Sequence, residues 1–334
     1  MVFSGVKRGA TGGALLQVLL LNGAGALLSL LFVGLLLSLP AGVVAQGVES
    51  EPVEHRSYLE GMQIITRQSG SGGPIPEGGL PVSAITILPE RTGWEGAGGV
   101  YVQNNTTYQP DYEALLQQKF SFAAGNGPQV LLYHTHTTEA YSNGLHYYLP
   151  ETAVYNENNN RNIVSVGDTL AAALERFGVD TLHETTRCDT SFNQAYAKSL
   201  QVAQAALERE SGVQFVVDLH RDSMITAEGV KYRPVVESDG MEAAQLMLVV
   251  GSPQSGLAHA DWQQNLATAM RLYLILEELC PGIMRPISIS TNRYNQHISP
   301  HALLVEVGSC GNTLEQAQLS AEVLAEGIAQ LISN

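Results

Sequence analysis

Cysteine is scarce in this chain: it has three in 334 residues, Cys188, Cys280 and Cys310. No two of them have the short spacing that marks a zinc knuckle, and an odd number excludes a fully paired disulfide framework. One disulfide with one thiol left over is the alternative in an exported protein. We expect three free thiols that are buried in the core.

Basic residues are also few, since 17 Lys and Arg stand against 32 Asp and Glu. All of the acidic residues follow position 48 together with 15 of the basic ones, so this part of the chain carries a formal charge of −17. A surface of that sign repels phosphate backbones, which excludes nucleic acid as an expected partner. Acidity alone identifies no other partner.

Charge is absent between Arg8 and Glu49, and most of Leu15–Val44 is apolar. This run exceeds the roughly 20 residues that cross a bilayer, and two basic residues precede it. We therefore predict a single-pass anchor in the cell membrane within residues 1–45, with a cytoplasmic tip and an extracytoplasmic remainder. The alternative is a cleaved signal peptide with its cleavage region at 41–45.

The rest of the chain divides into three segments that differ in composition. Residues 46–79 are rich in Gly, Pro and Ser and are typical of a flexible linker. Residues 80–127 are a small lead-in segment, in which VSAITIL and GVYVQNNT favour a hairpin or another small substructure and Asp111 is a candidate N-cap for a short helix. Residues 128–334 are long enough to bury one core, and they contain no internal repeat.

Hydrophobic spacing in 128–334 alternates between the two kinds of element. We expect strands at 130–133, 179–183, 215–219, 244–251 and 302–307, and helices at 162–177, 191–210, 263–280 and 314–332. Strands that alternate with helices of 15–20 residues predict an α/β fold, with a mixed or largely parallel sheet flanked by helices. The loops 140–161 and 224–240 are expected to wall a groove.

Candidate metal ligands follow two of the predicted strands. VLLYHTHTTEAY carries His134, His136 and Glu139, and FVVDLHRDS carries His220. A catalytic zinc site needs three nitrogen or oxygen ligands and an open position. We predict His136, Glu139 and His220 as the ligands and His134 in a supporting position beside them. Histidines that only cap their strands are the structural alternative.

A single glutamate, Glu306, lies inside the apolar strand LLVEVG. An unpaired charge there is costly unless it is used, and burial raises a carboxyl pKa toward general-base catalysis. We predict Glu306 as the general base, against a structural salt bridge to Arg221.

Further residues have candidate roles around these. Arg221 is predicted to hold a substrate carboxylate and Asp222 to orient a ligating histidine. The polar loop before the last strand offers substrate contacts from Tyr294, Asn295 and His297. Glu151 and Glu157 are alternative metal ligands.

Four motifs together resemble the stage II sporulation protein P family of membrane-anchored peptidoglycan hydrolases. They are THTTEAY (Thr135–Tyr141), FVVDLHRDS (Phe215–Ser223), YNQHISPHALLVEVG (Tyr294–Gly308) and GNTLEQA (Gly311–Ala317). The resemblance covers about 130–334 and implies a fold like that of the zinc-dependent N-acetylmuramoyl-L-alanine amidases. It also implies cleavage of the muramoyl–alanine amide bond, and of peptide cross-links, during sporulation.

The resemblance assigns roles residue by residue. It implies His136 and His220 as zinc ligands and matches Glu306 to the catalytic glutamate. The amidases take another ligand from a glutamate that opens the helix after the first loop, but Asn159–Gly167 has none. Glu139 therefore becomes the expected middle ligand. Implied partners are peptidoglycan and a sporulation protein D, in the space between two membranes during engulfment.

Two other functions fit the same residues. A zinc carboxypeptidase acting on wall peptides has the same His-x-x-Glu pair and a distant histidine, and it needs an arginine for the terminal carboxylate. A membrane-anchored scaffold with a structural metal needs no catalytic glutamate.

Overall fold

The computed structural model describes residues 64–66, 74–94, 96–122, 127–150, 154–238 and 240–333. All of them belong to one of two units of the chain, Glu54–Asn334. The predicted anchor and most of the predicted linker lie outside the described residues. Within the described ranges, no helix combines the length and apolar character needed to cross a bilayer.

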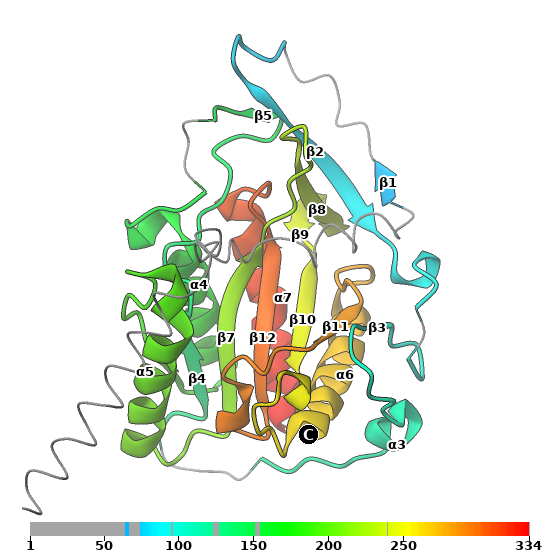
Figure 1. Cartoon of the computed structure of the whole chain (residues 1–334), viewed down its shortest axis with the longest axis vertical. Coiled ribbons are helices and arrows are strands. Elements are labelled where there is room, and N and C mark those ends of the chain that lie inside the picture. Colours follow the sequence, from blue (N-terminus) through cyan, green and yellow to red (C-terminus); the bar gives the residue numbers. More distant parts are fainter. Residues whose placement is uncertain are drawn as a thin grey trace, which may run out of the picture. The chain divides into compact units, whose positions relative to one another are not determined.

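A seven-stranded sheet forms the centre of this unit (Figure 1). Its order is β3 (Val102–Asn104), β11 (Ile287–Ser290), β10 (Leu246–Gly251), β12 (Ala302–Ser309), β7 (Phe215–Asp222), β4 (Val130–Tyr133) and β6 (Thr181–His183). The strands β12, β7, β4 and β6 run parallel, whereas β10 is antiparallel to β12 and parallel to β11. The prediction of an α/β fold with a mixed sheet is confirmed.

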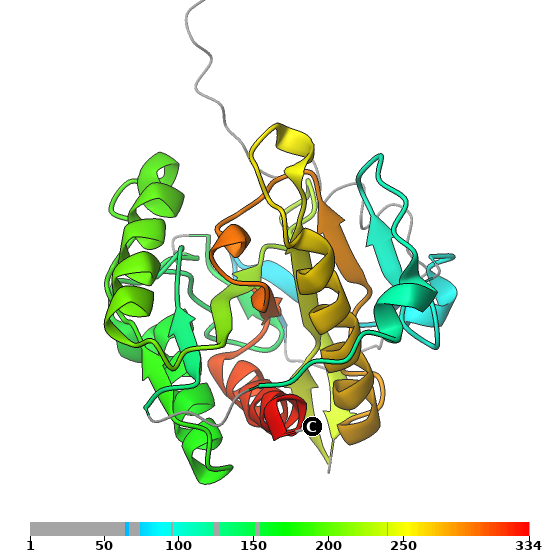
Figure 2. The same ribbon diagram turned by 90° about the horizontal axis from the view of Figure 1, so that it is seen from below.

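Helices cover both faces of this sheet. The helices are α4 (Ile163–Arg176), α5 (Ala195–Arg209), α6 (Trp262–Leu279), α7 (Leu314–Ser333) and the short α3 (Tyr112–Leu116). Apolar residues of α4, α6 and α7 share one core with the sheet, and those of α5 pack in a second core on the other face. Figure 2 accordingly shows α5 and α7 on opposite sides of the strands.

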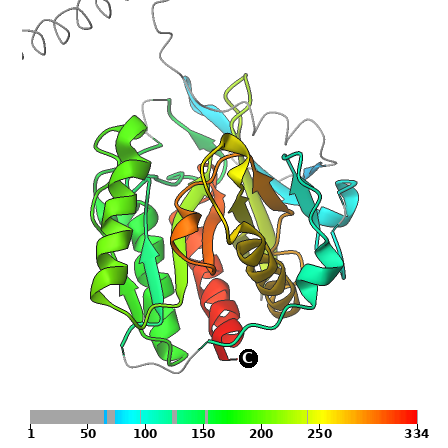
Figure 3. The same ribbon diagram turned by 60° about the horizontal axis from the view of Figure 1, so that its bottom comes forward.

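The helix ends follow from local chemistry that the sequence displays. The Asn162 side chain accepts a hydrogen bond from the Val164 amide at 2.9 Å and so caps α4, which ends before Gly178 at a φ of 81°. Asp111 caps α3 in the same way, as predicted. Figure 3 shows α6 and α7 side by side. Gly327 permits that approach, because a Cβ there would lie 2.6 Å from Leu276 Cδ2.

A second, five-stranded sheet was not expected. It has the order β1 (Ile64–Thr66), β2 (Leu80–Ile87), β8 (Lys231–Ser238) and β9 (Met241–Ala244), and β5 (Tyr147–Tyr148) pairs with β2. The predicted lead-in hairpin is wrong, because β2 joins this sheet while β3 joins the main one. The predicted loop 224–240 is also wrong, since it contains β8.

The polar sequence of β8, KYRPVVES, explains the error. Pro234 argues against a strand with neighbours on both sides, yet β8 lies between β2 and β9. Its basic residues are buried by partners that the sequence does not reveal: Lys231 lies 3.8 Å from the Tyr148 ring centroid, and Arg233 pairs with Glu242. All three cysteines are buried thiols, as expected.

Gln245 ties the two sheets together. Its amide oxygen accepts from the Ile87 amide, and its amide nitrogen donates to the carbonyls of Ile87 and Gly282, each at 2.8 Å. Gln245 is fully buried. These contacts satisfy main-chain groups at the end of β2 that would otherwise be buried without partners.

We predict that Gln245→Leu lowers the free energy of unfolding by about 3 kcal/mol, because it leaves buried main-chain groups unsatisfied. Urea denaturation measures the change. Gln201→Leu on the exposed side of α5 is the control and should stay within about 0.5 kcal/mol of the wild type. Equal stability of the two variants would contradict this role of Gln245.

Candidate metal centre

Strand β7 carries a row of polar residues on one face of the main sheet. Phe215, Val217 and Leu219 point into the core shared with α4, α6 and α7. The alternate positions Asp218 and His220, and Asp222 after them, therefore point to the opposite face. On the neighbouring strand β12, Glu306 is the register partner of His220. Both side chains thus leave the same face next to each other.

The turn after β4 brings His136 to this row. The imidazole stacks on Phe192, with ring centroids 4.7 Å apart, and lies edge-on to Tyr196 and to His220 at 5.7 and 5.4 Å. His136 is 9% exposed, and its Nδ1 has no hydrogen-bond partner. Burial lowers the pKa of His136, which favours the neutral form that binds a metal.

Two carboxylates flank His220. Its Nδ1 lies 3.5 Å from Glu139 Oε2, and its Nε2 lies 3.0 Å from Asp218 Oδ1. The contact between Nε2 and Asp218 Oδ1 does not meet hydrogen-bond geometry, so we describe it as an ion pair. Burial disfavours the charged imidazole, but the two carboxylates outweigh burial and raise the pKa of His220 well above its usual range. The position attracts a cation.

Glu139 is a charged group in a buried setting. Its Oε2 accepts a hydrogen bond from the Arg221 amide at 2.9 Å. Burial favours the neutral acid, but the charges of Arg221 and His220 outweigh it and hold the pKa of Glu139 at about 2. A carboxylate that is ionised at neutral pH and adjacent to a histidine nitrogen is a suitable metal ligand.

The pKa of Glu306 is shifted in the opposite direction to that of Glu139. Burial, supported by the negative charge of Asp222, raises the pKa of Glu306 to about 8. Its Oε2 is buried and has no hydrogen-bond partner. A carboxyl group that titrates near neutral pH and is not engaged in a salt bridge can accept and return a proton during a reaction.

The donor set fits zinc in kind, and one of its spacings is close to that of a zinc site. In tetrahedral zinc sites, bonds of about 2.0–2.1 Å place neighbouring ligand atoms about 3.3 Å apart. The 3.5 Å between Glu139 Oε2 and His220 Nδ1 is close to this value, and His136 Nδ1 is unpartnered. Among the described residues, however, no three His, Cys, Asp or Glu side chains already converge as a complete metal shell.

Comparison with known proteins decides the family. The model of the family "Stage II sporulation protein P" matches residues 99–329. The chain belongs to the stage II sporulation protein P family. Stage II sporulation protein P of Bacillus subtilis (strain 168) is 28% identical over 220 residues, which are 62% of this chain and 52% of that protein. The chain thus spans about half the length of this relative of the same family.

Solved structures similar to this family member include two amidases. The N-acetylmuramoyl-L-alanine amidase AmiC2 of Nostoc punctiforme is 17% identical, with 63% of this chain and 97% of that chain covered and a TM-score of 0.36. The CwlD amidase of Clostridioides difficile, solved with the GerS lipoprotein, is 14% identical, with 61% and 94% covered and a TM-score of 0.35. At these scores the likeness carries no argument about the site.

In this member of the family, Arg221 is part of the interior. It is 3% exposed, and its guanidinium donates to the carbonyls of Ala140 and Val154 at 3.0 and 2.7 Å. This differs from the substrate-carboxylate role that we predicted. Arg221 instead holds the ends of the segment between Ala140 and Val154 against β7.

Asp222 is likewise engaged in the interior. Its Oδ2 accepts a hydrogen bond from Arg285 at 2.5 Å, and its Oδ1 accepts one from the Ser223 amide at 2.6 Å. The orienting role that we predicted for Asp222 fits Asp218 better, because Asp218 is the aspartate beside His220. The sequence contains a signal for Asp218 in the period-two pattern D-x-H-x-D of β7.

His134 lies beside the row but faces elsewhere. Its Nδ1 lies 3.0 Å from the Leu219 carbonyl, and its Nε2 lies 2.8 Å from Nε2 of His183. Burial lowers the pKa of His134 to about 3, with the charge of His183 in support. Both nitrogens are therefore occupied by groups other than the candidate ligands.

The loop 291–299 contributes only in part. Asn295 donates to Ser199 Oγ and to the Tyr196 carbonyl at 2.9 and 3.0 Å. Tyr294, which has a positive φ of 52°, lies with its ring 5.6 Å from that of Tyr196. Burial, supported by the positive charge of Arg293, lowers the pKa of His297. The rings of Tyr196 and Phe192 were missed from the sequence.

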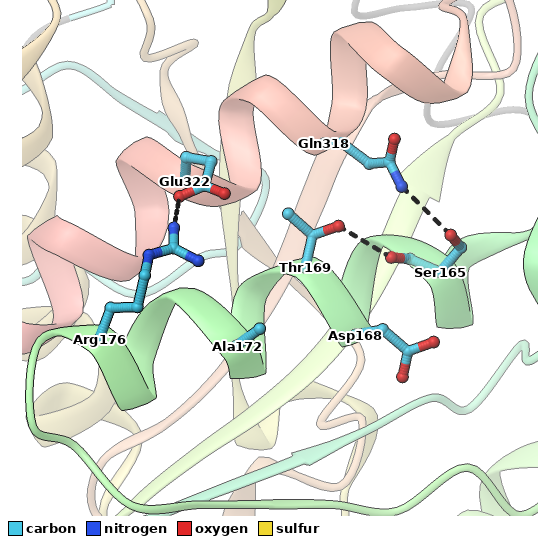
Figure 4. A pocket seen from close by; sticks show the side chains of 7 residues that line it. All are labelled: Ser165, Asp168, Thr169, Ala172, Arg176, Gln318 and Glu322. Atoms are coloured by element: carbon cyan, nitrogen blue, oxygen red, sulfur yellow. Dashed lines mark hydrogen bonds and ion pairs between the residues drawn. The ribbon is translucent and has the colours of Figure 1, made fainter.

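The remaining candidates lie apart. Glu157 pairs with Arg187 at 2.8 Å on the surface, and Glu151 lies outside the described residues. A hollow of about 420 Å³ lies between α4 and α7 (Figure 4). Its lining is Ser165, Asp168, Thr169, Ala172, Arg176, Gln318 and Glu322. None of these belongs to the candidate centre, and Arg176 pairs with Glu322 across the hollow.

We predict that Arg221→Met loosens the segment between Ala140 and Val154. The amide of Ala140, which bonds to the Val154 carbonyl, should exchange with solvent about tenfold faster or more, since a hydrogen bond to a charged group contributes about 1.5–3 kcal/mol. Hydrogen exchange measures this. Arg161→Met at an exposed position is the control, and unchanged exchange in Arg221→Met would contradict the anchoring role.

Proposed function

We propose that this protein is a zinc-dependent peptidoglycan hydrolase that cleaves the N-acetylmuramoyl-L-alanine amide bond, and peptide cross-links, during sporulation. The observation that carries the proposal is the buried, unpartnered Oε2 of Glu306 beside His220, the histidine that His136 and Glu139 both approach. Membership of the sporulation family supports the substrate class.

The proposed zinc ligands are His136, Glu139 and His220. Charge balance supports a divalent cation there. Four carboxylates lie in or beside the row, those of Glu139, Asp218, Asp222 and Glu306. Two permanent cations pair with them, Arg221 with Glu139 and Arg285 with Asp222. Without a metal, the balance is met by a proton on His220 and a proton on Glu306. Zinc with a neutral His220 balances four ionised carboxylates.

Zinc, when bound, polarises the scissile carbonyl and makes water a better nucleophile near neutral pH. The protein residues do the rest of the work. Glu306 takes a proton from the attacking water and returns it to the leaving amide nitrogen, for which a raised pKa is suited. Phe192 and Tyr196 flank His136 and limit the access of bulk water to it.

The location of the protein remains part of the proposal. We place it in the cell membrane by a single N-terminal helix, with the catalytic domain extracytoplasmic, in the space between two membranes during engulfment. The long apolar run before Glu49 supports this placement, and the tether would raise the concentration of the enzyme at the wall. Peptidoglycan and a sporulation protein D are the proposed partners.

The carboxypeptidase alternative loses its main support. It needs an arginine that binds a terminal carboxylate, and Arg221 donates to main-chain carbonyls in the interior instead. The scaffold alternative predicts a protein that binds metal and leaves peptidoglycan intact.

We predict that Glu306→Gln lowers the rate of peptidoglycan cleavage by about 100-fold or more, because it removes the general base. Mass spectrometry of fragments released from purified peptidoglycan measures the rate and identifies the bond. Glu208→Gln on the exposed face of α5 is the matched control and should cleave normally. Release of single amino acids from intact stems would favour the carboxypeptidase, and normal cleavage by Glu306→Gln would refute the catalytic assignment.

Zinc content provides an independent prediction. The purified wild-type protein should contain zinc, and a chelator should remove both the metal and the cleavage activity. His220→Ala should not retain zinc, because it deletes the ligand that two carboxylates flank. His146→Ala, a change at a half-buried histidine outside the centre, should retain it. Full activity in a metal-free preparation would exclude the proposed mechanism.

A further inference from the structure

Asp218 is a buried carboxylate of the row to which neither the predicted ligand set nor the proposed mechanism gives a role. Its Oδ1 accepts from the Thr135 amide at 2.8 Å and its Oδ2 from the Thr135 hydroxyl at 2.6 Å. Both oxygens are thereby fixed, and Oδ1 is fixed at 3.0 Å from His220 Nε2. Asp218 is a rigid negative charge aimed at one nitrogen of the imidazole.

Thr135 couples this charge to the turn that carries His136. Thr135 directly precedes His136, and its hydroxyl also contacts Ser199 Oγ at 2.7 Å. Ser199 in turn accepts from Asn295 at 2.9 Å. The carboxylate of β7 is therefore joined to the end of β4 and to α5 by a buried chain of hydrogen bonds, and such chains hold their members in one arrangement.

The position of Asp218 has a consequence for His220. A neutral imidazole carries its proton on one nitrogen and a lone pair on the other, and a nearby carboxylate stabilises the proton on the nitrogen that faces it. Asp218 Oδ1 lies 3.0 Å from Nε2 and Glu139 Oε2 lies 3.5 Å from Nδ1, so in the neutral imidazole the nearer carboxylate favours the proton on Nε2 and leaves the lone pair on Nδ1. Nδ1 is the atom that lies 3.5 Å from Glu139 Oε2. The tautomer thus points the lone pair at the other candidate ligand.

We propose that Asp218, held by Thr135, is a positioning residue that fixes the Nε2–H tautomer of His220 and presents Nδ1 to the metal. This inference rests on the proposed zinc site. It differs from the sequence-based expectation, which gave the orienting role to Asp222. Carboxylates behind a ligating histidine raise its basicity and orient its ring.

The test compares zinc affinity among three variants of the full chain. Asp218→Asn keeps the shape and the acceptor for the Thr135 amide but removes the charge, and should weaken zinc binding about 10- to 100-fold. Thr135→Val removes the hydroxyl that fixes Asp218 Oδ2 and should also weaken zinc binding, but by less than Asp218→Asn does. Ser199→Ala breaks the chain one step further away and should weaken zinc binding less than Thr135→Val does.

Zinc affinity is measured by competition with a chromophoric chelator, and thermal unfolding of each metal-free variant shows whether it is folded. Thr135→Val carries the test if Asp218→Asn does not fold. Two-bond proton–nitrogen NMR of histidine-labelled, zinc-loaded wild type reports the tautomer independently, and should show a proton on Nε2 of His220 with Nδ1 bound to zinc.

The outcomes separate this inference from the proposed function. A wild-type protein that binds no zinc overturns both. Zinc binding by the wild type with unchanged affinity in Asp218→Asn and Thr135→Val overturns the positioning role alone. Coordination of His220 through Nε2 also overturns it, because Asp218 would then be a neighbour or a ligand of the metal. Equal loss in Ser199→Ala would show a general effect of packing, and would overturn it as well.

Discussion

The site depends on one constraint: charged groups are buried on the face of β7 opposite to its apolar core. A charge in the interior is costly unless it is paired, and this face carries Asp218, His220 and Asp222 at alternate positions, with Glu306 alongside on β12. Arg285 pairs with Asp222 and Arg221 with Glu139. At His220 the charges of Asp218 and Glu139 outweigh burial and raise the pKa well above its usual range, and at Glu306 burial, supported by the charge of Asp222, raises the pKa to about 8. The same imbalance creates the demand for a cation.

The two buried arginines near the site, Arg221 and Arg285, make structural contacts and take no part in the proposed chemistry. Both arginines lie close to the candidate ligands. Arg221 donates to main-chain carbonyls, and Arg285 donates to the buried Asp222. They fix the carboxyl end of β7 and the segment that begins at Ala140. Among the described residues of the centre, His136 Nδ1, His220 Nε2 and Glu306 Oε2 are buried without hydrogen-bond partners, and we assign metal binding to the two histidines and proton transfer to Glu306.

Sequence patterns predicted the central elements because those elements depend on local signals. The apolar spacing and the Asn162 cap define α4, and the continuous apolar runs define β4, β7 and β12. The second sheet escaped because β8 is stabilised by distant partners: Arg233 pairs with Glu242, and Lys231 contacts Tyr148. Glu306 and His220 were foreseen as neighbours because parallel strands end at one edge. The burial of Arg221 was not foreseen, because it depends on the carbonyls of Ala140 and Val154, which are distant in the sequence.

The position of a bound metal tests the central claim most directly. Anomalous diffraction at the zinc edge from crystals of the zinc-loaded protein locates the ion without assumptions about activity. We expect one strong peak within bonding distance of His136, Glu139 and His220, with an open coordination position on the side of an unbound Glu306. A peak elsewhere, or a closed shell in which Glu306 is itself a ligand, would contradict the account.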